Sequence, residues 1–514
     1  IRAKDRDIPV TLSSELLPEI KEYERTSTTV VNTYILPVVK HYLGRLAERL
    51  SDRRIDKPLT IMQSSGGAMS AEAAAERPIH IIESGPAAGV VGAAELARRL
   101  DNASLLSFDM GGTTAKAALV DNGQYLRVGA LEVGGGINIA GRLLSGGGYH
   151  VRAPAIDIAE VGAGGGSLVQ LDGGGGLKVG PESAGAAPGP ACYGRGGTLP
   201  TVTDANVILG FINPVALAGG GLPIRRDLAV SALQVMVATP LGLSIEEAAW
   251  GVHRVANATM ARALRAVSTE RGRDPREFAI MAFGGNGPVH AATLAKLLEI
   301  KRILVPPVPG LFSALGMLFP EVEHHYVRTF KRNLAGLDPE ALDKVFRTME
   351  EEGDAALAEE GFVPEHRRYE RQIDLRYVGA NSELTVDFPA EGDAAAILRQ
   401  GFGAAHERQY GYRSDEEAVE TMNLRVIARG VAAMAHVPNR LTLGDAPHAG
   451  MGARQVYFGP ETGSVKTPIC SRADLDGSWR QGPLLVEEFD STTVIPPGAR
   501  ARRIAWDTIE IELG

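Results

Sequence analysis

Two kinds of apolar pattern alternate along the first two thirds of the chain. Apolar residues recur at helical spacing over 14–50 and 244–270, which predicts amphipathic helices. Short, uninterrupted apolar runs predict buried strands, and they lie at 59–62, 105–108, 117–120, 280–283 and 303–305. Because strands and helices alternate, the pattern predicts an α/β fold.

The pattern changes in later parts of the chain. Groups of glycines without a fixed period interrupt short apolar pieces from 129 to 222, which is typical of tight turns near a ligand or partner. A charged amphipathic helix is predicted near 338–360, and the last 80 or so residues combine Pro and Gly with short β runs. We therefore expect a larger domain over 1–325 that includes the glycine-rich region, and a smaller α+β domain over 326–514, mostly β from about 430.

Composition narrows the class of protein. The chain has 514 residues, a net charge of −9 and 44% hydrophobic residues, which is ordinary for a globular protein. The acidic balance argues against a nucleic-acid groove or a membrane-surface role, because both normally need a basic face. No apolar run reaches the roughly 18 residues of a membrane span. The two cysteines are far apart in sequence, which favours a reducing, cytoplasmic setting over a disulfide framework.

The most informative stretch is Asp109-Met110-Gly111-Gly112-Thr113-Thr114, which lies between two apolar runs and predicts a strand, a tight turn and a strand. Adjacent glycines let the backbone approach a ligand closely. Their N–H groups, with the hydroxyls of Thr113 and Thr114, can surround phosphate oxygens. Asp109 would then face Mg²⁺ or an attacking water as the catalytic and metal-binding carboxylate. An ATPase of the actin and sugar-kinase type needs such a hairpin, whereas a Walker loop would end in Gly-Lys-Ser or Gly-Lys-Thr before a helix.

A second candidate element follows about 170 residues later, where a buried strand, Gly284-Gly285-Asn286 and a helix succeed one another. Such a turn lets backbone lie flat against an adenosine, so we predict that Gly284, Gly285 and Asn286 bind a nucleotide. Each element has a simpler alternative: paired glycines arise by chance in a chain with 61 of them, and many strands turn into helices without a ligand. Jointly, the two elements are better explained by a nucleotide site.

Other polar residues are better explained by structure than by chemistry. We expect His290 to be a packed or capping residue and Cys192 to be a small buried hydrophobe. Asp204 or Thr203 is predicted to cap a helix. His324 and His325 are adjacent, so both cannot point at one ligand from a strand. The expected metal is therefore Mg²⁺ held largely by ATP phosphates.

These motifs resemble the A-type (ATPase) subunit of the hydantoinase/oxoprolinase family. The ordered matches are 23–32, 64–67, 84–90, 108–114, 162–167, 179–185, 188–194, 201–206, 282–291, 376–379, 406–407 and 490–493. The resemblance implies an actin/sugar-kinase-like (ribonuclease-H-like) ATPase core with a smaller, mostly β C-terminal domain. It also implies ATP, Mg²⁺ and a B-type partner subunit.

The family's chemistry leaves three hypotheses. In the first, the chain activates a cyclic amide or imide of the hydantoin or 5-oxoproline type by phosphorylation for ring opening. In the second, it is the equivalent subunit of an ATP-dependent ketone carboxylase. The third is a non-catalytic scaffold with the ATPase fold.

The sequence also differs from the family's usual pattern in two ways. Family members begin with a further lobe that carries its own Asp-x-Gly-Gly-Thr hairpin, and this chain starts after it. We therefore expect weak or absent ATPase activity from this chain alone unless another polypeptide supplies that lobe. The segment Gly379-Ala380-Asn381-Ser382 lacks the Gln that usually follows this glycine in the family, so substrate contacts there differ.

Overall fold

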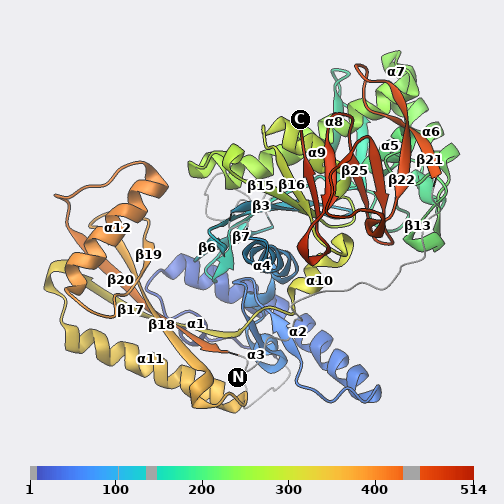
Figure 1. Cartoon of the computed structure of the whole chain (residues 1–514). Helices are drawn as coiled ribbons and strands as arrows, with labels where there is room; N and C mark the ends of the chain where they lie inside the picture. Colours follow the sequence, from blue (N-terminus) through green and yellow to red (C-terminus); the bar gives the residue numbers. More distant parts are fainter. Residues whose placement is uncertain (1–7, 102–103, 135–147, 432–451) are drawn as a thin grey trace.

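The computed structural model describes residues 8–101, 104–134, 148–431 and 452–514 (Figure 1). It is a mixed α/β structure, as the sequence predicts. Two large sheets organise the described chain. Parts of the glycine groups at 134–136 and 146–148, and the start of the β-rich region expected from about 430, lie outside the described residues.

A nine-stranded sheet forms the larger lobe, on the right of Figure 1. Its two central pairs are parallel, β3 with β15 and β15 with β16, and its other pairs are antiparallel. Along the sheet the order is β10 (Ile158–Val161), β4 (Ala115–Asp121), β3 (Leu105–Met110), β15 (Ala279–Phe283), β16 (Arg302–Val305), β27 (Ile509–Glu512), β26 (Arg500–Arg503) and β23 (Arg480–Gln481), with β5 (Gln124–Tyr125) beside β4. All five residues of β15 are buried, as its apolar run predicts.

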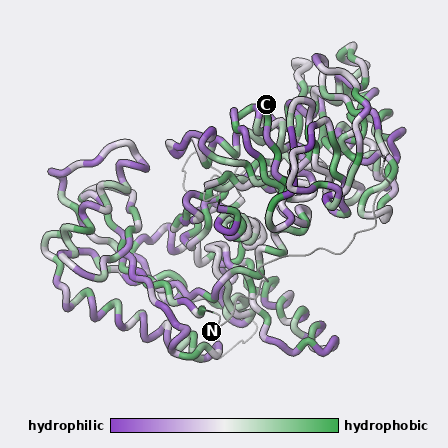
Figure 2. The backbone as a smooth tube through the Cα atoms, viewed as in Figure 1, coloured by the Kyte–Doolittle hydropathy of each residue, from purple (hydrophilic) through white to green (hydrophobic). Residues whose placement is uncertain are grey.

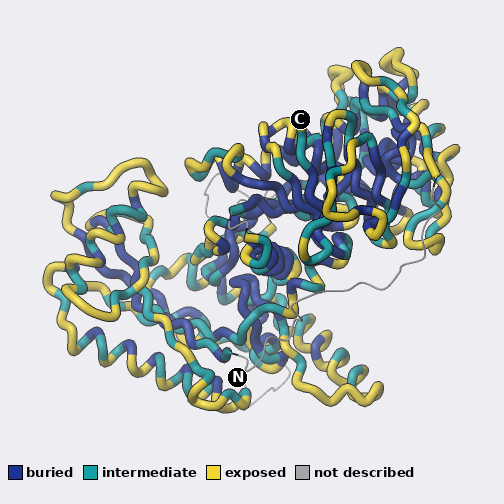
Figure 3. Tube along the Cα trace, viewed as in Figure 1, coloured by how far each residue is buried: buried dark blue, intermediate teal, exposed yellow. Residues whose placement is uncertain are grey.

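Helices cover both faces of this sheet, because its strands send apolar side chains alternately to each side. On one side Leu106 and Phe108 pack in a core with α5 (Val202–Leu209), α8 (Ile245–Val267) and α9 (Gly287–Leu297). On the other side Leu105 packs with α4 (Ser84–Arg99) and α10 (Phe312–Gly316). Figure 3 shows the central strands as the most deeply buried part of this lobe.

Helix α8 begins where the sequence predicts. The Ser244 hydroxyl accepts from the Glu247 N–H at 3.2 Å, and the Glu247 carboxylate accepts from the Ser244 N–H at 3.0 Å. This reciprocal capping satisfies N–H groups that have no partner within the helix. No single described helix is long and apolar enough to cross a membrane. One pair bent by 92°, Arg226–Leu241 and Ile245–Arg271, meets the length and composition criteria, but its second helix buries its apolar side in the core.

A six-stranded sheet forms the smaller lobe, on the left of Figure 1. Two helices, α11 (Pro339–Glu359) and α12 (Ala394–Tyr410), pack on it around one apolar core. Figure 2 shows hydrophilic and hydrophobic residues alternating along α11, as an amphipathic surface helix requires. The strand order is β1 (Thr60–Met62), β2 (Ala68–Ser70), β17 (Val322–Asn333), β20 (Val419–Gly430), β18 (Arg367–Tyr377) and β19 (Leu384–Asp387).

The two sheets do not follow the boundary predicted between 325 and 326. Strands β1 and β2, early in the chain, join the sheet of the smaller lobe, and β17 crosses the boundary itself. The last strand, β27, pairs with β16 of the larger lobe. A four-stranded sheet from the same C-terminal part packs against the larger lobe's core, with strands β21 (Gly452–Tyr457), β22 (Ser464–Cys470), β24 (Leu484–Glu487) and β25 (Thr492–Ile495). The strands of the chain therefore alternate between the two sheets: smaller lobe, larger lobe, smaller lobe again and then larger lobe.

Four pairs of short strands lie in or next to the described part of the glycine-rich region. They are β6 (Arg127–Val128) with β9 (Ala155–Ile156), β7 (Leu131–Val133) with β8 (Tyr149–Val151), β11 (Ser167–Leu171) with β12 (Leu177–Ser183), and β13 (Ala216–Leu217) with β14 (Leu222–Pro223). Before it, α1 (Ser13–Leu16), α2 (Glu22–Asp52) and α3 (Ala71–Glu76) precede the larger sheet, and α2 continues through Pro37. Helices α6 (Arg226–Leu233) and α7 (Thr239–Leu241) lead to α8.

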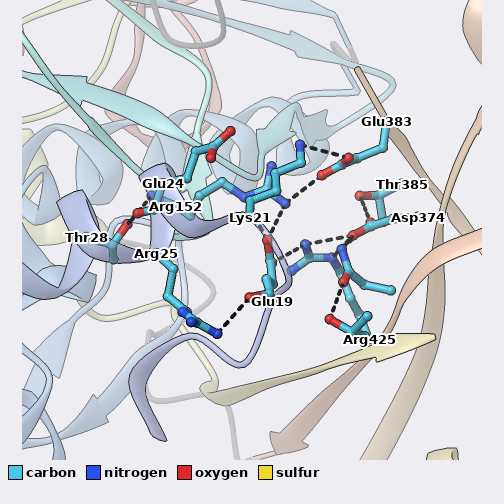
Figure 4. Close-up of polar contacts among 12 residues, drawn as sticks. Glu19, Lys21, Glu24, Arg25, Thr28, Arg152, Asp374, Glu383, Thr385 and Arg425 are labelled. Carbon is cyan, nitrogen blue, oxygen red and sulfur yellow. Dashed lines mark hydrogen bonds and ion pairs between the residues drawn. The ribbon is translucent and has the colours of Figure 1, made fainter. Parts of the chain in front are cut away.

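A cluster of six charged residues, which we call the ion cluster, connects the smaller lobe to the segment before α2 and to the end of β8 (Figure 4). It consists of Glu19, Lys21, Arg152, Asp374, Glu383 and Arg425. Arg425 lies 2.9 Å from Glu19 and 2.8 Å from Asp374, and Arg152 lies 2.7 Å from Glu19. Each buried charge thus has an opposite charge in contact, which offsets the cost of desolvating it.

We predict that Asp374→Asn lowers the free energy of unfolding by about 3 kcal/mol at pH 7, because it removes one of the two buried carboxylates that contact the Arg425 guanidinium and leaves only Glu19. Burial raises the pKa of Asp374, but Arg425 outweighs it and lowers that pKa from 3.8 to about 2. The stabilisation is therefore complete above about pH 4 and is lost as the pH falls towards 2.

Guanidinium titrations at pH 7 and at pH 3 measure both effects, and the difference from wild type shrinks at the lower pH. The matched control is Asp227→Asn, which breaks an exposed pair with Arg225 and changes stability little. An Asp374→Asn protein as stable as wild type at pH 7 contradicts the prediction.

Candidate nucleotide site

The predicted hairpin forms at the end of β3. Strands β3 and β4 pair antiparallel, and the turn closes with the Gly111 N–H donating to the Thr114 carbonyl at 3.1 Å. A methyl group built on either Gly111 or Gly112 would meet no atom within 4 Å. The two glycines therefore face open space, which a ligand can occupy without displacing protein atoms.

Asp109 lies at the base of this hairpin in a half-buried position. Burial raises the pKa of its carboxyl group, while Lys116 and a 3.5 Å contact with the Ser313 hydroxyl lower it. Lys116 lies directly across from Asp109 in the sheet, and Glu160 lies across from Lys116, with Nζ and Oε1 3.2 Å apart. Directly opposed side chains share one face, so the three charges form a row beside the hairpin.

The glycine turn after β15 lies against the same hairpin. Parallel pairing sets Phe283 beside Asp109, so Gly284 follows next to the carboxylate. Gly284 has φ +78°, and a side chain there would collide with Asp109 and with the Met110 carbonyl. Asn286 donates from its backbone N–H to Met110 O at 3.0 Å and from Nδ2 to Gly111 O at 3.2 Å. The predicted site residues from both parts of the sequence are therefore brought together at one edge of the sheet.

The glycine-rich region contributes a loop that the sequence did not assign to the site. Gly165 donates to Gly111 O at 3.0 Å, and Gly166 donates to Gly112 O at 2.6 Å. A Cβ on Gly164 would lie 2.6 Å from the backbone of Thr113. The run from Gly162 to Ser167 was the available signal, but glycine spacing alone does not identify the segment it touches.

A C-terminal loop braces the glycine turn, and it too was not predicted. The Ser491 hydroxyl donates to Gly285 O at 3.2 Å, and the Gly310 N–H donates to Asp490 Oδ2 at 2.8 Å. Gly284 in turn donates to Pro309 O at 2.8 Å. The run 490–493 was visible as a motif, but its position next to Gly285 depends on pairings between distant strands.

A cavity of about 800 Å³ opens beside this turn. Gly285 and Asn286 line it together with Tyr193, Leu217 and Phe489. Its volume is within the range of about 300–1,000 Å³ that small-molecule sites occupy. Asn286 therefore connects the hairpin to a cavity large enough for a ligand.

The histidines have structural partners. His290 is fully buried, with Nε2 3.0 Å from Asn206 Nδ2 and Nδ1 3.0 Å from Asn257 Nδ2, and burial lowers its pKa well below the usual range. This agrees with the packed role expected for it. His324 lies 2.9 Å from Glu360, and His325 lies 3.2 Å from Glu323. Within the described residues, no three His, Cys, Asp or Glu side chains are arranged to hold a metal ion.

The capping of α5 differs from expectation. Its N-cap is Thr201, whose hydroxyl accepts from the Asp204 N–H, and Asp204 completes a capping box by accepting from the Thr201 N–H, whereas Thr203 takes no part in the cap. The Asp204 carboxylate accepts from the N–H groups of Thr201, Ala191 and Cys192 at 2.8, 3.2 and 2.7 Å. It is thus occupied in holding the loop before the helix. Cys192 is buried and free, and burial raises the pKa of its thiol.

We predict that Gly284→Ala destabilises the protein by about 2 kcal/mol or more, since a left-handed backbone and a collision with Asp109 add together. The matched control is Gly285→Ala in the same turn. A Cβ there has only ordinary contact with Asp490 O at 3.7 Å, so we expect a change within about 0.5 kcal/mol. Thermal unfolding of the two variants gives the comparison, and equal stabilities would show that Gly284 is not constrained by Asp109.

Comparison with known proteins identifies relatives over nearly the whole chain. The family model for hydantoinase/oxoprolinase matches residues 25–326. The chain is 43% identical over 507 residues to an uncharacterised protein of Methanocaldococcus jannaschii, which covers 98% of this chain and 73% of that protein. It is 33% identical over 532 residues to caprolactamase subunit alpha of Pseudomonas jessenii, which covers 100% of this chain and 73% of that subunit.

Two solved structures are also similar to this chain over nearly its whole length. The crystal structure of the ATP-dependent caprolactamase from Pseudomonas jessenii matches with a TM-score of 0.79 at 31% identity, over 98% of this chain and 72% of that chain. The nucleotide-free structure of acetone carboxylase matches with a TM-score of 0.77 at 25% identity, over 98% and 71%. The resemblance inferred from the motifs is thus confirmed, and the chain belongs to the hydantoinase/oxoprolinase family.

Proposed function

We propose that this chain is the ATP-using subunit of an enzyme that activates a cyclic amide by phosphorylation and opens its ring. The observation that carries the proposal is the meeting of Asp109 and the Gly111–Gly112 hairpin with the Gly284–Asn286 turn at one sheet edge. The similarity to an ATP-dependent caprolactamase supports it, because caprolactam is a cyclic amide. The actin-like class of its ATPase core is part of the same proposal.

The hairpin suits the phosphates of ATP. Gly111 and Gly112 leave open space in front of the turn, and Thr113 and Thr114 add hydroxyl groups beside it. Backbone amides in such a turn stabilise negative oxygens without bulky side chains. Asp109 is the carboxylate at the base of the hairpin and would hold Mg²⁺, whose other ligands would be phosphate and water oxygens. When bound, the cation screens the phosphate charge and favours phosphoryl transfer.

Phosphorylation solves a chemical problem that ring amides present. The amide carbonyl carbon is a poor electrophile, since the nitrogen lone pair is delocalised into it. Transfer of the γ-phosphoryl group to the amide oxygen releases ADP and makes that carbon open to attack by water. The protein's part in this scheme is to position the phosphates and balance their charge, and Asp109 is the carboxylate that would contact the cation or the nucleophile.

A partner subunit belongs to the proposal. The caprolactamase relative is named as one subunit, alpha, and the family resemblance implies a B-type partner. The second candidate function is the equivalent subunit of a ketone carboxylase, which the similarity to acetone carboxylase favours. Both chemistries begin with activation of a carbonyl-derived oxygen by ATP, so the same nucleotide site serves either. A third possibility, a scaffold that retains the fold, predicts that Asp109 can be replaced without loss.

The deciding test is substrate-dependent phosphate release by the full gene product with its co-purifying subunits. We expect release from Mg-ATP with caprolactam, 5-oxoproline or a hydantoin, and none with acetone or acetophenone plus bicarbonate. Asp109→Asn should reduce that rate by about three orders of magnitude, a loss within the range measured for single charge-stabilising groups. Ketone-dependent release would favour the carboxylase, and full activity of Asp109→Asn would favour the scaffold.

Lys116 gives a separate prediction about pH. Burial raises the pKa of Asp109 and Lys116 lowers it, so Lys116→Met should raise that pKa further. Less of the carboxylate is then ionised at low pH, and the acid limb of the kcat/KM profile should move to higher pH. Lys116→Arg keeps the charge and should leave the limb in place. Glu83 and Glu160, which also face Lys116, are the same in both variants. If the acid limb of Lys116→Met lies at the same pH as that of wild type, Lys116 does not lower the pKa of Asp109 in the working enzyme.

A further inference from the structure

The cavity beside Gly285 has charged residues in its walls, but these charges are already paired. Arg472 contacts Glu488 at 2.6 Å and donates to the carbonyls of Val305 and Pro306 at 3.0 and 2.9 Å. Arg503 lies 3.3 Å from Asp507. A ligand that brought its own charge here would compete with these contacts.

The carboxylates on the other walls are occupied as well. Glu487 contacts Arg454 and accepts from Asn213 Nδ2 at 3.1 Å. Asp490 accepts from the Gly310 N–H at 2.8 Å. The cavity therefore favours a ligand group that is neutral and polar at its edges over one that carries phosphate.

One wall of this cavity includes an exposed aromatic side chain. Phe489, in the loop between β24 and β25, is 57% exposed and lines the cavity. Its ring lies against Gly219, where a Cβ would be only 3.0 Å from Cδ2. Tyr193, Leu217 and Val308 add apolar surface to the walls. A flat neutral heterocycle can cover such a ring and remove it from water.

The cavity also begins where the phosphate hairpin ends. Asn286 lines the cavity, and its Nδ2 donates to Gly111 O at 3.2 Å. A ligand that extends from the hairpin past Asn286 therefore passes from a site suited to phosphate oxygens into one suited to a neutral ring. A nucleoside triphosphate has this order of groups.

From these contacts we infer that the cavity takes the nucleoside part of the triphosphate and that Phe489 is the platform on which a purine base stacks. The inference rests on the proposed use of ATP and adds a residue that determines nucleotide preference. Purines present a larger aromatic face than pyrimidines, so ATP and GTP bind more tightly than CTP or UTP. Adenine and guanine differ in their hydrogen-bond donors and acceptors, which a stacked ring does not contact. Phe489 therefore contributes little to the choice between the two purines.

The experiment is calorimetric titration of the full gene product, with its co-purifying subunits, using Mg-ATP, Mg-CTP and Mg-tripolyphosphate. Phe489→Ala should raise the Kd for Mg-ATP by about tenfold or more and reduce the preference for ATP over CTP. It should leave the Kd for tripolyphosphate unchanged. Phe489→Trp keeps an aromatic face and should retain ATP binding. Tyr34→Ala, which removes an exposed ring from α2, is the matched control and should change nothing.

The outcomes separate the two proposals. If wild type binds tripolyphosphate as tightly as ATP, or if Phe489→Ala binds ATP as tightly as wild type, the base lies elsewhere and the inference is wrong, while phosphate binding stands. If wild type binds neither ATP nor tripolyphosphate, both proposals are wrong. Equal losses for ATP and tripolyphosphate in Phe489→Ala would mean that the loop supports the hairpin and does not contact the base, which also overturns the inference.

Discussion

The parallel pairing of β3 with β15 is the constraint on which the candidate site depends. It joins segments about 170 residues apart and directs their carboxyl ends to one edge of the sheet. A slip of one residue would turn Asp109 to the opposite face and put an apolar neighbour at the hairpin. Gly284 fixes this register, since its missing side chain is what allows β15 to turn directly beside the carboxylate. The site therefore follows from backbone geometry first and from side-chain chemistry second.

The rest of the fold stabilises that edge from both sides. The glycine-rich loop bonds to the carbonyls of Gly111 and Gly112, and the loop that contains Asp490 and Ser491 contacts the turn at Gly285. Because β27 pairs with β16, the C-terminal segment is part of the sheet that carries the site. The smaller lobe is connected through the ion cluster of Figure 4, where opposite charges from distant segments meet in a buried position. Charges buried in this way favour one relative arrangement of the segments that supply them.

Local features were predictable from the sequence, and long-range pairings were not. The apolar run of β15, the Ser244 cap of α8 and the Asp109 hairpin depend on neighbours within a few residues, and each was predicted. The joining of β1 and β2 to β17, and of β27 to β16, depends on which edges remain open after the core forms. The hydrophobic pattern of the sequence does not tell which distant strands pair with one another. The boundary that it suggested at 326 therefore does not separate the two sheets. Gly284 was predicted as a ligand contact, which stays a prediction, and the structure adds a constraint that the sequence did not indicate: a side chain there would collide with Asp109.

Electrostatics gives a physical reason for a cation at this site. Three carboxyl groups, those of Asp109, Glu160 and Glu83, surround one ammonium group, that of Lys116. When all are ionised, this group is net negative beside the hairpin that we propose binds a triphosphate. Like charges in a partly buried place repel more strongly than in water. Burial relieves some of this by raising the pKa of Asp109, but a neutral Asp109 would lose its use as a carboxylate. If the chain uses ATP as we propose, a divalent cation held by Asp109 would resolve the conflict, because it would lower the pKa of the acid and compensate the charge of the ligand.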